Sequence, residues 1–223
     1  VPAPAPVSGS GAIAAPIPGK VLSLKVKVGD TVSADQIVLI DPRPGVGAQG
    51  LMESHGVKCV PALTGQIAAT LDTLVVAIKP DLVRSVLGKV SEDLPEGALV
   101  ISIAAGVPLR TLSAALPGRP IVRAMPNTPS AIGRGITAII GNEHATAEQV
   151  DLAEKLLKAV GQVVRLEREE QMDGVTAVSG SGPAYVFHLI ETMAKAGEEQ
   201  GLSPELALRL ASATVAGAGA LAD

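Results

Sequence analysis

The chain has 223 residues, 47% of them hydrophobic and 18% charged, with a net charge of −4. These values predict a globular chain of one or two domains and exclude a largely disordered one. The acidic balance and the presence of only two aromatic residues, Tyr185 and Phe187, argue against nucleic acid as a partner. No apolar run is long enough to span a bilayer, so we expect no membrane partner. The single cysteine, Cys59, makes a reducing cytoplasm the default expectation.

The first 34 residues differ from the rest of the chain. Residues 1–19 are rich in Pro, Ala, Gly and Ser, which is typical of an extended linker. Residues 20–28 alternate apolar and polar side chains, which predicts a strand, and a short strand at 31–32 follows a Gly-Asp turn. The stretch APIPGKVLSLKVKVGDTV resembles the first half of a biotinyl or lipoyl carrier domain. Because no Ala-Met-Lys-Met type motif follows it, we expect no carrier function.

From residue 35 onward, short apolar runs alternate with helix-like stretches, which predicts a Rossmann-like α/β domain with a parallel sheet over residues 35–166. Strands are expected at 37–40, 58–60, 73–78, 98–103, 121–124, 136–140 and 163–166. Helices are expected between them at 47–55, 64–69, 80–90, 109–116 and 147–160. Helices near 168–178, 183–200 and 204–221 then predict an all-helical domain over residues 167–223.

The residues that follow each strand are the first candidates for a site, because open parallel sheets bind ligands beyond the carboxyl ends of their strands. Asp41 and Arg43 follow the strand at 37–40. An acidic residue there can hydrogen-bond the ribose 2′-hydroxyl of NAD, so NAD remains a possible cofactor. Arg43 instead fits the 2′-phosphate of NADP. A simple surface arginine in a turn is the competing interpretation. Lys79 and Pro80 follow the next buried strand, where the ammonium group can either meet a phosphate or be solvated.

Small and amide side chains follow the next two strands. Ala104, Ala105 and Gly106 leave room for a flat nicotinamide ring, although small residues also suit tight packing of helix on sheet. In RAMPNTPSAIGRG, residues 123–135, two prolines bracket Asn127 and its neighbour, which predicts a stiff loop with polar groups available to a ligand. The alternative is a structural hydrogen bond of Asn127 within the loop.

The stretch VSGSGPAYVFHL, residues 178–189, predicts a small-residue turn that leads into an amphipathic helix. Gly182 lets a ligand approach the backbone closely, and Pro183 suits the first turn of a helix. The free N–H groups of such a turn attract a carboxylate, although a packing role alone is the competing interpretation. The helix carries an apolar stripe that requires a partner helix. The stripe consists of Val186, Leu189, Ile190, Met193, Ala194 and Gly197.

The motifs IVLIDPRP, VVAIKP, ISIAAGV, RAMPNTP and AVSGSGPAY, in this order and spacing, resemble pyrroline-5-carboxylate reductase over about residues 35–222. That family makes proline by reducing a cyclic imine with NAD(P)H. The resemblance implies that NADP, or NAD, contacts Arg43, Lys79, Pro80, Ala104, Ala105, Gly106 and Asn127. It implies that Ser181, Gly182 and Pro183 hold the substrate carboxylate, and that Glu169, or equally Glu170, lies near the substrate. The C-terminal helices of the family interlock subunits, so a homodimer or larger homo-oligomer is expected.

The implied reaction requires no strong nucleophile. Hydride transfer to a C=N carbon is easier when the nitrogen is protonated, and the protein mainly positions two rings and excludes water. The histidines, His55, His144 and His188, are widely separated in the sequence, so we expect no metal site.

Two features depart from the family pattern. The family begins with a strand and a Gly-x-Gly-x-x-Gly turn that binds the pyrophosphate, whereas this chain has the carrier-like segment before residue 35. Gly9-Ser10-Gly11 and Gly45-Val46-Gly47 are not expected to replace that turn between a strand and a helix. The strand at 20–28 can fill the central position of the sheet, although its lysines suit burial poorly. At the other end, the sequence stops short of the family's Ser-Pro-Gly-Gly-Thr-like loop and further helices.

The sequence therefore predicts an imine-reducing oxidoreductase whose cofactor binding is impaired. A second interpretation stays open, in which the chain is a catalytically impaired fragment that acts as a helical dimerisation or interaction module.

Overall fold

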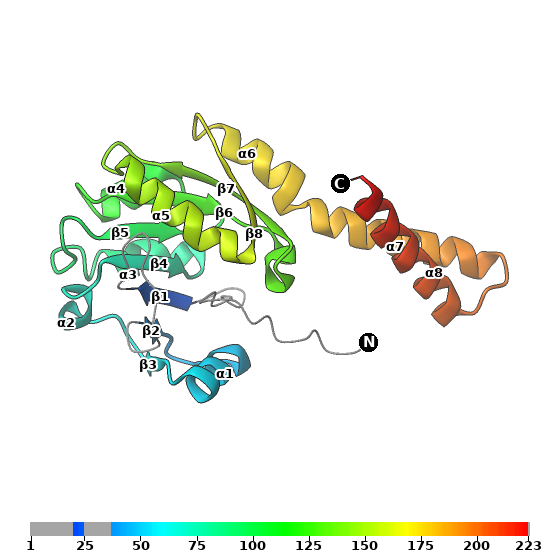
Figure 1. Cartoon of the computed structure of the whole chain (residues 1–223), viewed down its shortest axis with the longest axis horizontal. Helices are drawn as coiled ribbons and strands as arrows, with labels where there is room; N and C mark the ends of the chain where they lie inside the picture. The colour runs from blue at the N-terminus through cyan, green and yellow to red at the C-terminus, as the bar shows by residue number, and fades with distance from the viewer. Residues whose placement is uncertain (1–19, 25–36, 223) are drawn as a thin grey trace. The chain divides into compact units, whose positions relative to one another are not determined.

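The structure, a computed structural model, describes residues 20–24 and 37–222 (Figure 1). The expected linker at 1–19 and the short strand at 31–32 lie outside this range. The chain divides into two compact units, residues 1–173, here called the sheet unit, and residues 174–223, the helical unit. The sheet unit extends past Leu166, the predicted boundary. Glu169 bonds to Arg123 and Leu109 of this unit, and Met172 is buried, as described below. The assignment of 167–223 to one domain stays a prediction.

The described part of the sheet unit forms an eight-stranded sheet with the order β3-β2-β1-β4-β5-β6-β7-β8. β2 and β3 are parallel, as are β4, β5 and β6, and likewise β7 and β8. This arrangement, with helices on both faces, confirms the Rossmann-like α/β class. The strands are β1 (Lys20–Leu24), β2 (Ile37–Ile40), β3 (Lys58–Val60), β4 (Thr73–Ala77), β5 (Leu99–Ser102), β6 (Ile121–Met125), β7 (Gly135–Gly141) and β8 (Gly161–Arg165).

Two strands, β1 and β7, depart from the parallel direction that dominates the sheet. β7 pairs antiparallel with β6 because only residues 126–134, with a 3₁₀ turn at Thr128–Ile132, join the two strands. A parallel connection needs a crossover of about a dozen residues or more.

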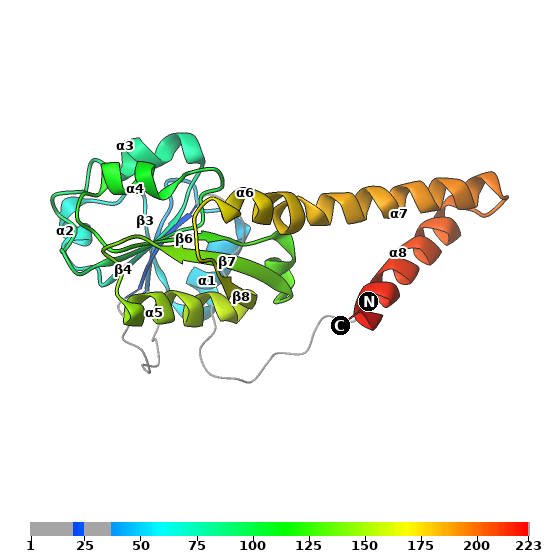
Figure 2. The same cartoon turned by 90° about the horizontal axis from the view of Figure 1, so that it is seen from above.

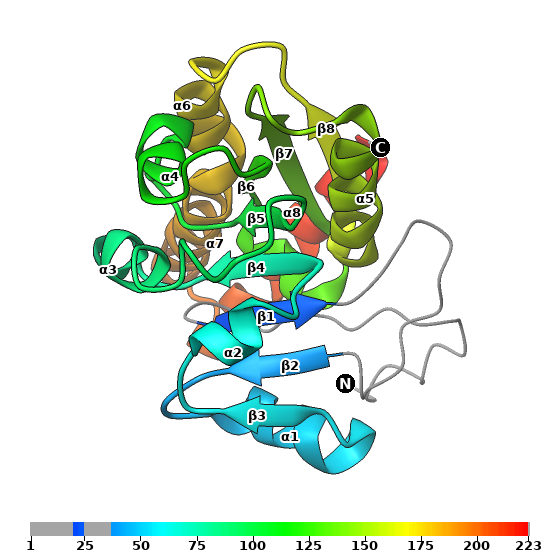
Figure 3. The same cartoon turned by 90° about the vertical axis from the view of Figure 1, so that its left-hand side faces the viewer.

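β1 lies at the centre of the sheet, between β2 and β4, and runs antiparallel to both (Figure 3). Residues 20–24 of the carrier-like segment thus fill the central position that the sequence left in doubt. Their backbone pairs with both neighbouring strands. Val21 lies opposite Ile40 of β2, for example, and Leu24 lies opposite Thr73 of β4. This pairing matters because an unpaired buried backbone group costs about 1–3 kcal/mol. Residues 25–28 of the predicted strand lie outside the described range.

Helices cover both faces of the sheet, with α3 and α4 on one face and α5 on the other (Figures 2 and 3). Leu74, Val76 and Leu112 belong to the cluster on the α3–α4 side, and Ile101 and Ile139 to the cluster that includes α5. The predicted helix at 80–90 is shorter, since a 3₁₀ turn (Pro80–Leu82) precedes α3 and α3 ends before Gly88. The helices are α1 (Val46–His55), α2 (Gly65–Ala68), α3 (Val83–Leu87), α4 (Leu109–Ala115), α5 (Ala147–Leu157) and α6 (Gln171–Val175).

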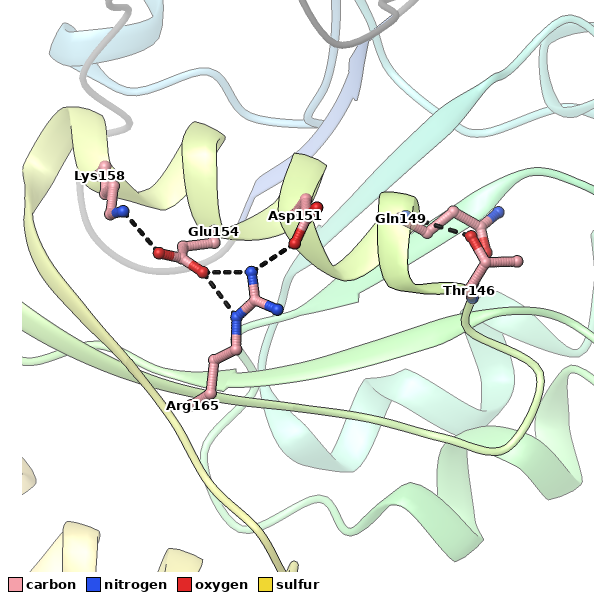
Figure 4. Close-up of polar contacts among 6 residues, drawn as sticks. All are labelled: Thr146, Gln149, Asp151, Glu154, Lys158 and Arg165. Carbon is pink, nitrogen blue, oxygen red and sulfur yellow. Dashed lines mark hydrogen bonds and ion pairs between the residues drawn. The ribbon is translucent and has the colours of Figure 1, made fainter.

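Ion pairs tie the edge strand β8 to α5 (Figure 4). Arg165 Nη2 lies 2.6 Å from Asp151 Oδ1, and Arg165 Nε donates to Glu154 Oε2 at 2.6 Å. Lys158 Nζ lies 2.5 Å from the other oxygen of Glu154. The hydrogen bonds from Lys158 and Arg165 lower the pKa of Glu154, and those to Asp151 and Glu154 raise the pKa of Arg165. A capping box between Thr146 and Gln149 begins α5.

The helical unit is a hairpin of two helices, α7 (Gly182–Glu199) and α8 (Pro204–Leu221), close to the predicted bounds. Ala194, Ala207 and Ala211 are buried between them, and Ile190 and Met193 pack against these alanines. This contact confirms the predicted partner helix for the second half of the apolar stripe. Many larger apolar side chains of the hairpin remain exposed. They include Tyr185, Val186, Phe187, Leu189, Leu206, Leu208, Leu210 and Leu221.

No helix within the described ranges is long and apolar enough to cross a membrane. Nor do His, Cys, Asp or Glu side chains of the described residues gather in a group of three suited to a metal ion.

Candidate functional site

Four strand ends meet at one edge of the sheet. β2 and β4 run in the same direction because β1 is antiparallel to both, and β5 and β6 are parallel to β4. The segments that follow these strands therefore lie along the edge where doubly wound folds bind ligands. This edge carries every residue predicted to bind the cofactor, namely Arg43, Lys79, Pro80, Ala104, Ala105, Gly106 and Asn127.

A tight turn after β2 presents Arg43. Asp41 is buried, with 9% of its surface exposed, and its Oδ1 accepts a hydrogen bond of 2.9 Å from the backbone N–H of Arg43. This local bond is typical of aspartate in turns and occupies one carboxylate oxygen. Arg43 itself is exposed, with Pro42 and Pro44 on either side. Asp41 therefore stabilises the turn, and the guanidinium group of Arg43 remains available to a ligand.

The sequence GVGAQG at residues 45–50 has the Gly-x-Gly-x-x-Gly spacing and lies between β2 and α1. Gly45 is the N-cap of α1, without a side-chain cap or an acidic residue in the first turn. The helix expected at 47–55 is α1, which begins at Val46, so this segment does open a helix after β2. It still differs from a dinucleotide fingerprint, since residues 41–44 separate it from its strand and β2 is not the central strand. Gly9-Ser10-Gly11 lies outside the described residues.

The central strand meets this edge with the opposite polarity from that of a dinucleotide-binding fold. Lys20, the first residue of β1, pairs with Ala77 at the carboxyl end of β4. Leu24, the last residue of β1, pairs with Thr73 at the amino end of β4, so β1 ends at the other edge of the sheet. In consequence, none of the described residues forms a glycine-rich turn directly after the central strand at the candidate site.

The ends of β4 and β5 provide an exposed cation and a row of small residues. Lys79 is exposed and precedes the 3₁₀ turn that Pro80 begins. Ala104 is buried, whereas Ala105 and Gly106 are exposed. Gly106 has a φ of +73°, in the left-handed region that glycine adopts without strain. An open backbone at this point suits the close approach of a planar group.

Asn127 holds the loop between β6 and β7. Its Oδ1 accepts a hydrogen bond of 3.0 Å from the backbone N–H of Ile136. Asn127 therefore does make the structural hydrogen bond within the loop that the sequence analysis gave as the alternative to ligand binding. Because the oxygen is engaged, the amide nitrogen Nδ2 is the group that Asn127 offers as a donor at the edge.

Glu169 contacts two segments of the sheet unit. Its Oε1 lies 2.6 Å from Arg123 Nη1 and accepts a second bond of 2.6 Å from the backbone N–H of Leu109. Glu170 is exposed. Sequence reasoning missed Arg123 and Leu109. The available signal was a single charged residue within the apolar strand IVRAM, because a buried arginine requires a partner.

The segment with Ser181, Gly182 and Pro183 belongs to the helical unit. A π-helix at Thr176–Gly180 precedes α7, and the N–H of Ser181 donates to Thr176 O at 2.8 Å. The expectation that a fresh helix start leaves this N–H free was wrong, because helical backbone continues through the turn. Gly182 and Pro183 are the first two residues of α7. Their role toward the substrate carboxylate, together with Ser181, stays a prediction.

Comparison with known proteins places this geometry in a family. Residues 169–223 match the model described as pyrroline-5-carboxylate reductase dimerisation, and residues 7–106 match that of the coenzyme F420-dependent NADP oxidoreductases. A pyrroline-5-carboxylate reductase of Pseudomonas aeruginosa is 39% identical over 194 residues, which is 86% of this chain and 70% of that protein. The chain belongs to the pyrroline-5-carboxylate reductase family. This result confirms the family resemblance.

Other members of the family agree in sequence and in fold. The reductase of Synechocystis sp. is 38% identical over 95% of this chain and 76% of its own length. The structure of the Coxiella burnetii reductase matches with a TM-score of 0.73 and 36% identity, covering 81% of this chain and 67% of that one. The Plasmodium falciparum enzyme with NADP bound matches with a TM-score of 0.70 and 30% identity, covering 80% of this chain and 64% of that one.

Proposed function

We propose that this chain reduces 1-pyrroline-5-carboxylate to proline with a pyridine nucleotide, the last step of proline biosynthesis. The observation that carries the proposal is the convergence of the ends of β2, β4, β5 and β6 at one edge, in a chain of this family. When bound, the nucleotide supplies the hydride that the carbon of the C=N bond receives. The remaining work of the protein is to orient the substrate and exclude water.

We assign Arg43 to the 2′-phosphate of NADP. Its guanidinium is exposed at the strand end, and the carboxylate of Asp41 accepts a bond from Arg43's own backbone. Arginine forms paired hydrogen bonds with phosphates, and the N-terminus of α1, which begins three residues further at Val46, favours negative charge as well. NADP is thus preferred over NAD in this proposal.

The next two strand ends suit the nicotinamide half of the cofactor. The small side chains of Ala104 and Ala105 and the open backbone at Gly106 fit a flat ring. The Nδ2 of Asn127 donates toward a carbonyl or carboxylate oxygen at the same edge. Lys79 adds a positive charge toward the phosphates. Protonation of the imine nitrogen, from solvent or from the substrate's own equilibrium, raises the electrophilicity of the carbon.

We propose a homodimer or larger homo-oligomer through α7 and α8. Among its described residues, the hairpin fully buries only alanines between its two helices, while Phe187 is 65% and Leu208 52% exposed. Exposed apolar surface of this kind marks an association surface. Within this proposal Ser181, Gly182 and Pro183 hold the substrate carboxylate. The cytoplasm stays the expected compartment.

The test is cofactor binding followed by turnover. NADPH fluorescence and thermal shift, with and without proline, should show saturable binding, and NADPH absorbance should fall when the imine is added. Arg43→Ala should weaken NADPH binding about tenfold to hundredfold, the effect of losing a charge-assisted hydrogen bond, while NADH binding changes little. Lys89→Ala, at an exposed lysine beyond α3, is the matched control and should leave both affinities unchanged. No response of the unmodified chain at millimolar NADPH would favour the non-catalytic dimerisation module instead.

A further inference from the structure

A partly buried ion pair joins segments that adjoin the two loops that we assign to the nicotinamide. The side chains of Arg123 and Glu169 are 9% and 27% exposed, and their closest atoms, Nη1 and Oε1, are 2.6 Å apart. The same Oε1 accepts from the N–H of Leu109, again at 2.6 Å. One carboxylate oxygen thus joins strand β6, the first residue of α4 and the segment before α6.

Each partner of Glu169 lies close in sequence to a cofactor loop. Leu109 is three residues after Gly106, and Arg123 is four residues before Asn127. Pro108, the N-cap of α4, provides no side-chain cap, so the carboxylate of Glu169 takes that role from a distant part of the chain. Met172, three residues after Glu169 and 1% exposed, anchors the following helix in the sheet unit.

We propose that Arg123 and Glu169 are positioning residues that hold the loops at 103–109 and 126–127 in the geometry required for hydride transfer. This inference rests on the proposed function and gives Glu169 a role through the cofactor loops. The charge on Arg123 keeps the carboxylate in place, because a buried guanidinium without a partner is strongly disfavoured. The carboxylate then fixes the start of α4, and with it the path of the small residues that precede it.

The consequence for the reaction is specific. A displacement of about 1 Å in a loop that orients a reacting ring can cost about a hundredfold in rate. The expected signature is therefore a fall in kcat with little change in KM for the imine, because the substrate contacts are not altered. A residue that only stabilised the fold would lower the amount of active protein and leave the kcat of the folded fraction unchanged.

The experiment compares Glu169→Gln, Arg123→Met and the double variant with Glu154→Gln, which removes a carboxylate from the surface ion pairs of the same unit. Hydrogen exchange of the amides at 104–112 should be about tenfold faster in the Glu169 and Arg123 variants, and unchanged in the Glu154 variant. Single-turnover reduction should slow about a hundredfold in the single variants. The double variant should be no worse than Arg123→Met, since the two residues act as one pair.

Four outcomes decide between the proposal and its alternatives. Unchanged exchange at 104–112 in folded Glu169→Gln would overturn it, as would additive effects of the two substitutions. Faster exchange with an unchanged single-turnover rate would overturn the positioning role and leave a structural one. Absence of NADPH binding by the unmodified chain would instead refute the proposed function, and with it the catalytic part of this inference. The exchange measurement would still show whether Glu169 holds the start of α4.

Discussion

In the sheet unit, residues 1–173, the largest fully buried side chains of the described residues, from Ile37 to Ile139, belong to three apolar clusters. In the helical unit, residues 174–223, the buried residues are alanines, while leucines and both aromatic side chains of the chain are exposed. The sheet unit can therefore obtain its stability from its own core. The helical unit has the pattern of half an interface, whose apolar residues lose water only when another surface covers them.

The largest expected effect tests how tightly the sheet unit is packed. Gly161 begins β8 with a φ of +142°, and a Cβ there would lie 2.0 Å from the carbonyl oxygen of Gly135 on β7. Gly161→Ala should reduce the free energy of unfolding by about 3 kcal/mol or more, from backbone strain and overlap. Urea denaturation followed by circular dichroism measures it.

The matched control is Gly50→Ala in α1, where nothing lies within 4 Å of the added Cβ. This change should be neutral or stabilising by up to about 1 kcal/mol, because alanine favours helix. Equal effects of the two substitutions would show that β7 and β8 are not as closely apposed as described.

The next effect tests the helical unit as an interface. Phe187→Glu or Leu208→Glu should raise the dissociation constant of the oligomer about a hundredfold, since a charge in a buried apolar contact costs several kcal/mol. Analytical ultracentrifugation over a range of concentrations gives this constant. Val46→Glu, at a residue of the sheet unit that is 86% exposed, is the control and should leave association unchanged. An oligomer that tolerates both helical substitutions would remove the distinction drawn between the two units.

Asn127 allows a sharper test of what the sheet unit contributes to the site. Asn127→Asp keeps the oxygen that accepts from Ile136 and loses the Nδ2 donor. Stability should change by less than about 0.5 kcal/mol. By contrast, kcat/KM should fall about tenfold or more, as expected for the loss of one hydrogen bond to a ligand. A comparable loss of stability and no loss of turnover would assign Asn127 to the loop alone.

The smallest effect concerns the surface of the sheet unit. Because Lys158 and Arg165 lower the pKa of Glu154 in the folded state, this carboxylate stabilises the fold above its ordinary pKa of 4.5. The contribution disappears as the pH falls through the lowered value. The Glu154→Gln variant should therefore have a slightly lower melting temperature than the unmodified chain at pH 7. This difference in melting temperature should vanish under more acidic conditions. It should also shrink in high salt. A difference that grows on acidification would contradict the pairing in Figure 4.

The sequence alone determined the order and type of most elements. Ile37–Ile40 and Thr73–Ala77 are continuous apolar runs, which is the pattern of strands buried on both faces, and both were located within a residue. The first long helix of the helical unit, α7, followed from a 3.6-residue periodicity and from proline in its first turn. The candidate residues at the strand ends could be predicted because the order of strands and helices along the chain shows which residues follow each strand. In a parallel sheet these residues lie at the carboxyl edge.

Only the tertiary structure decided the direction of β1 and the partners of Glu169. An alternating strand reads the same for parallel and antiparallel pairing, so residues 20–24 contain no local signal of their direction. Arg123 and Glu169 are separated by 46 positions, and neither side chain by itself specifies its partner. Local patterns determine which segments bury apolar surface, whereas strand polarity and the pairing of distant charges depend on how the whole chain closes upon itself.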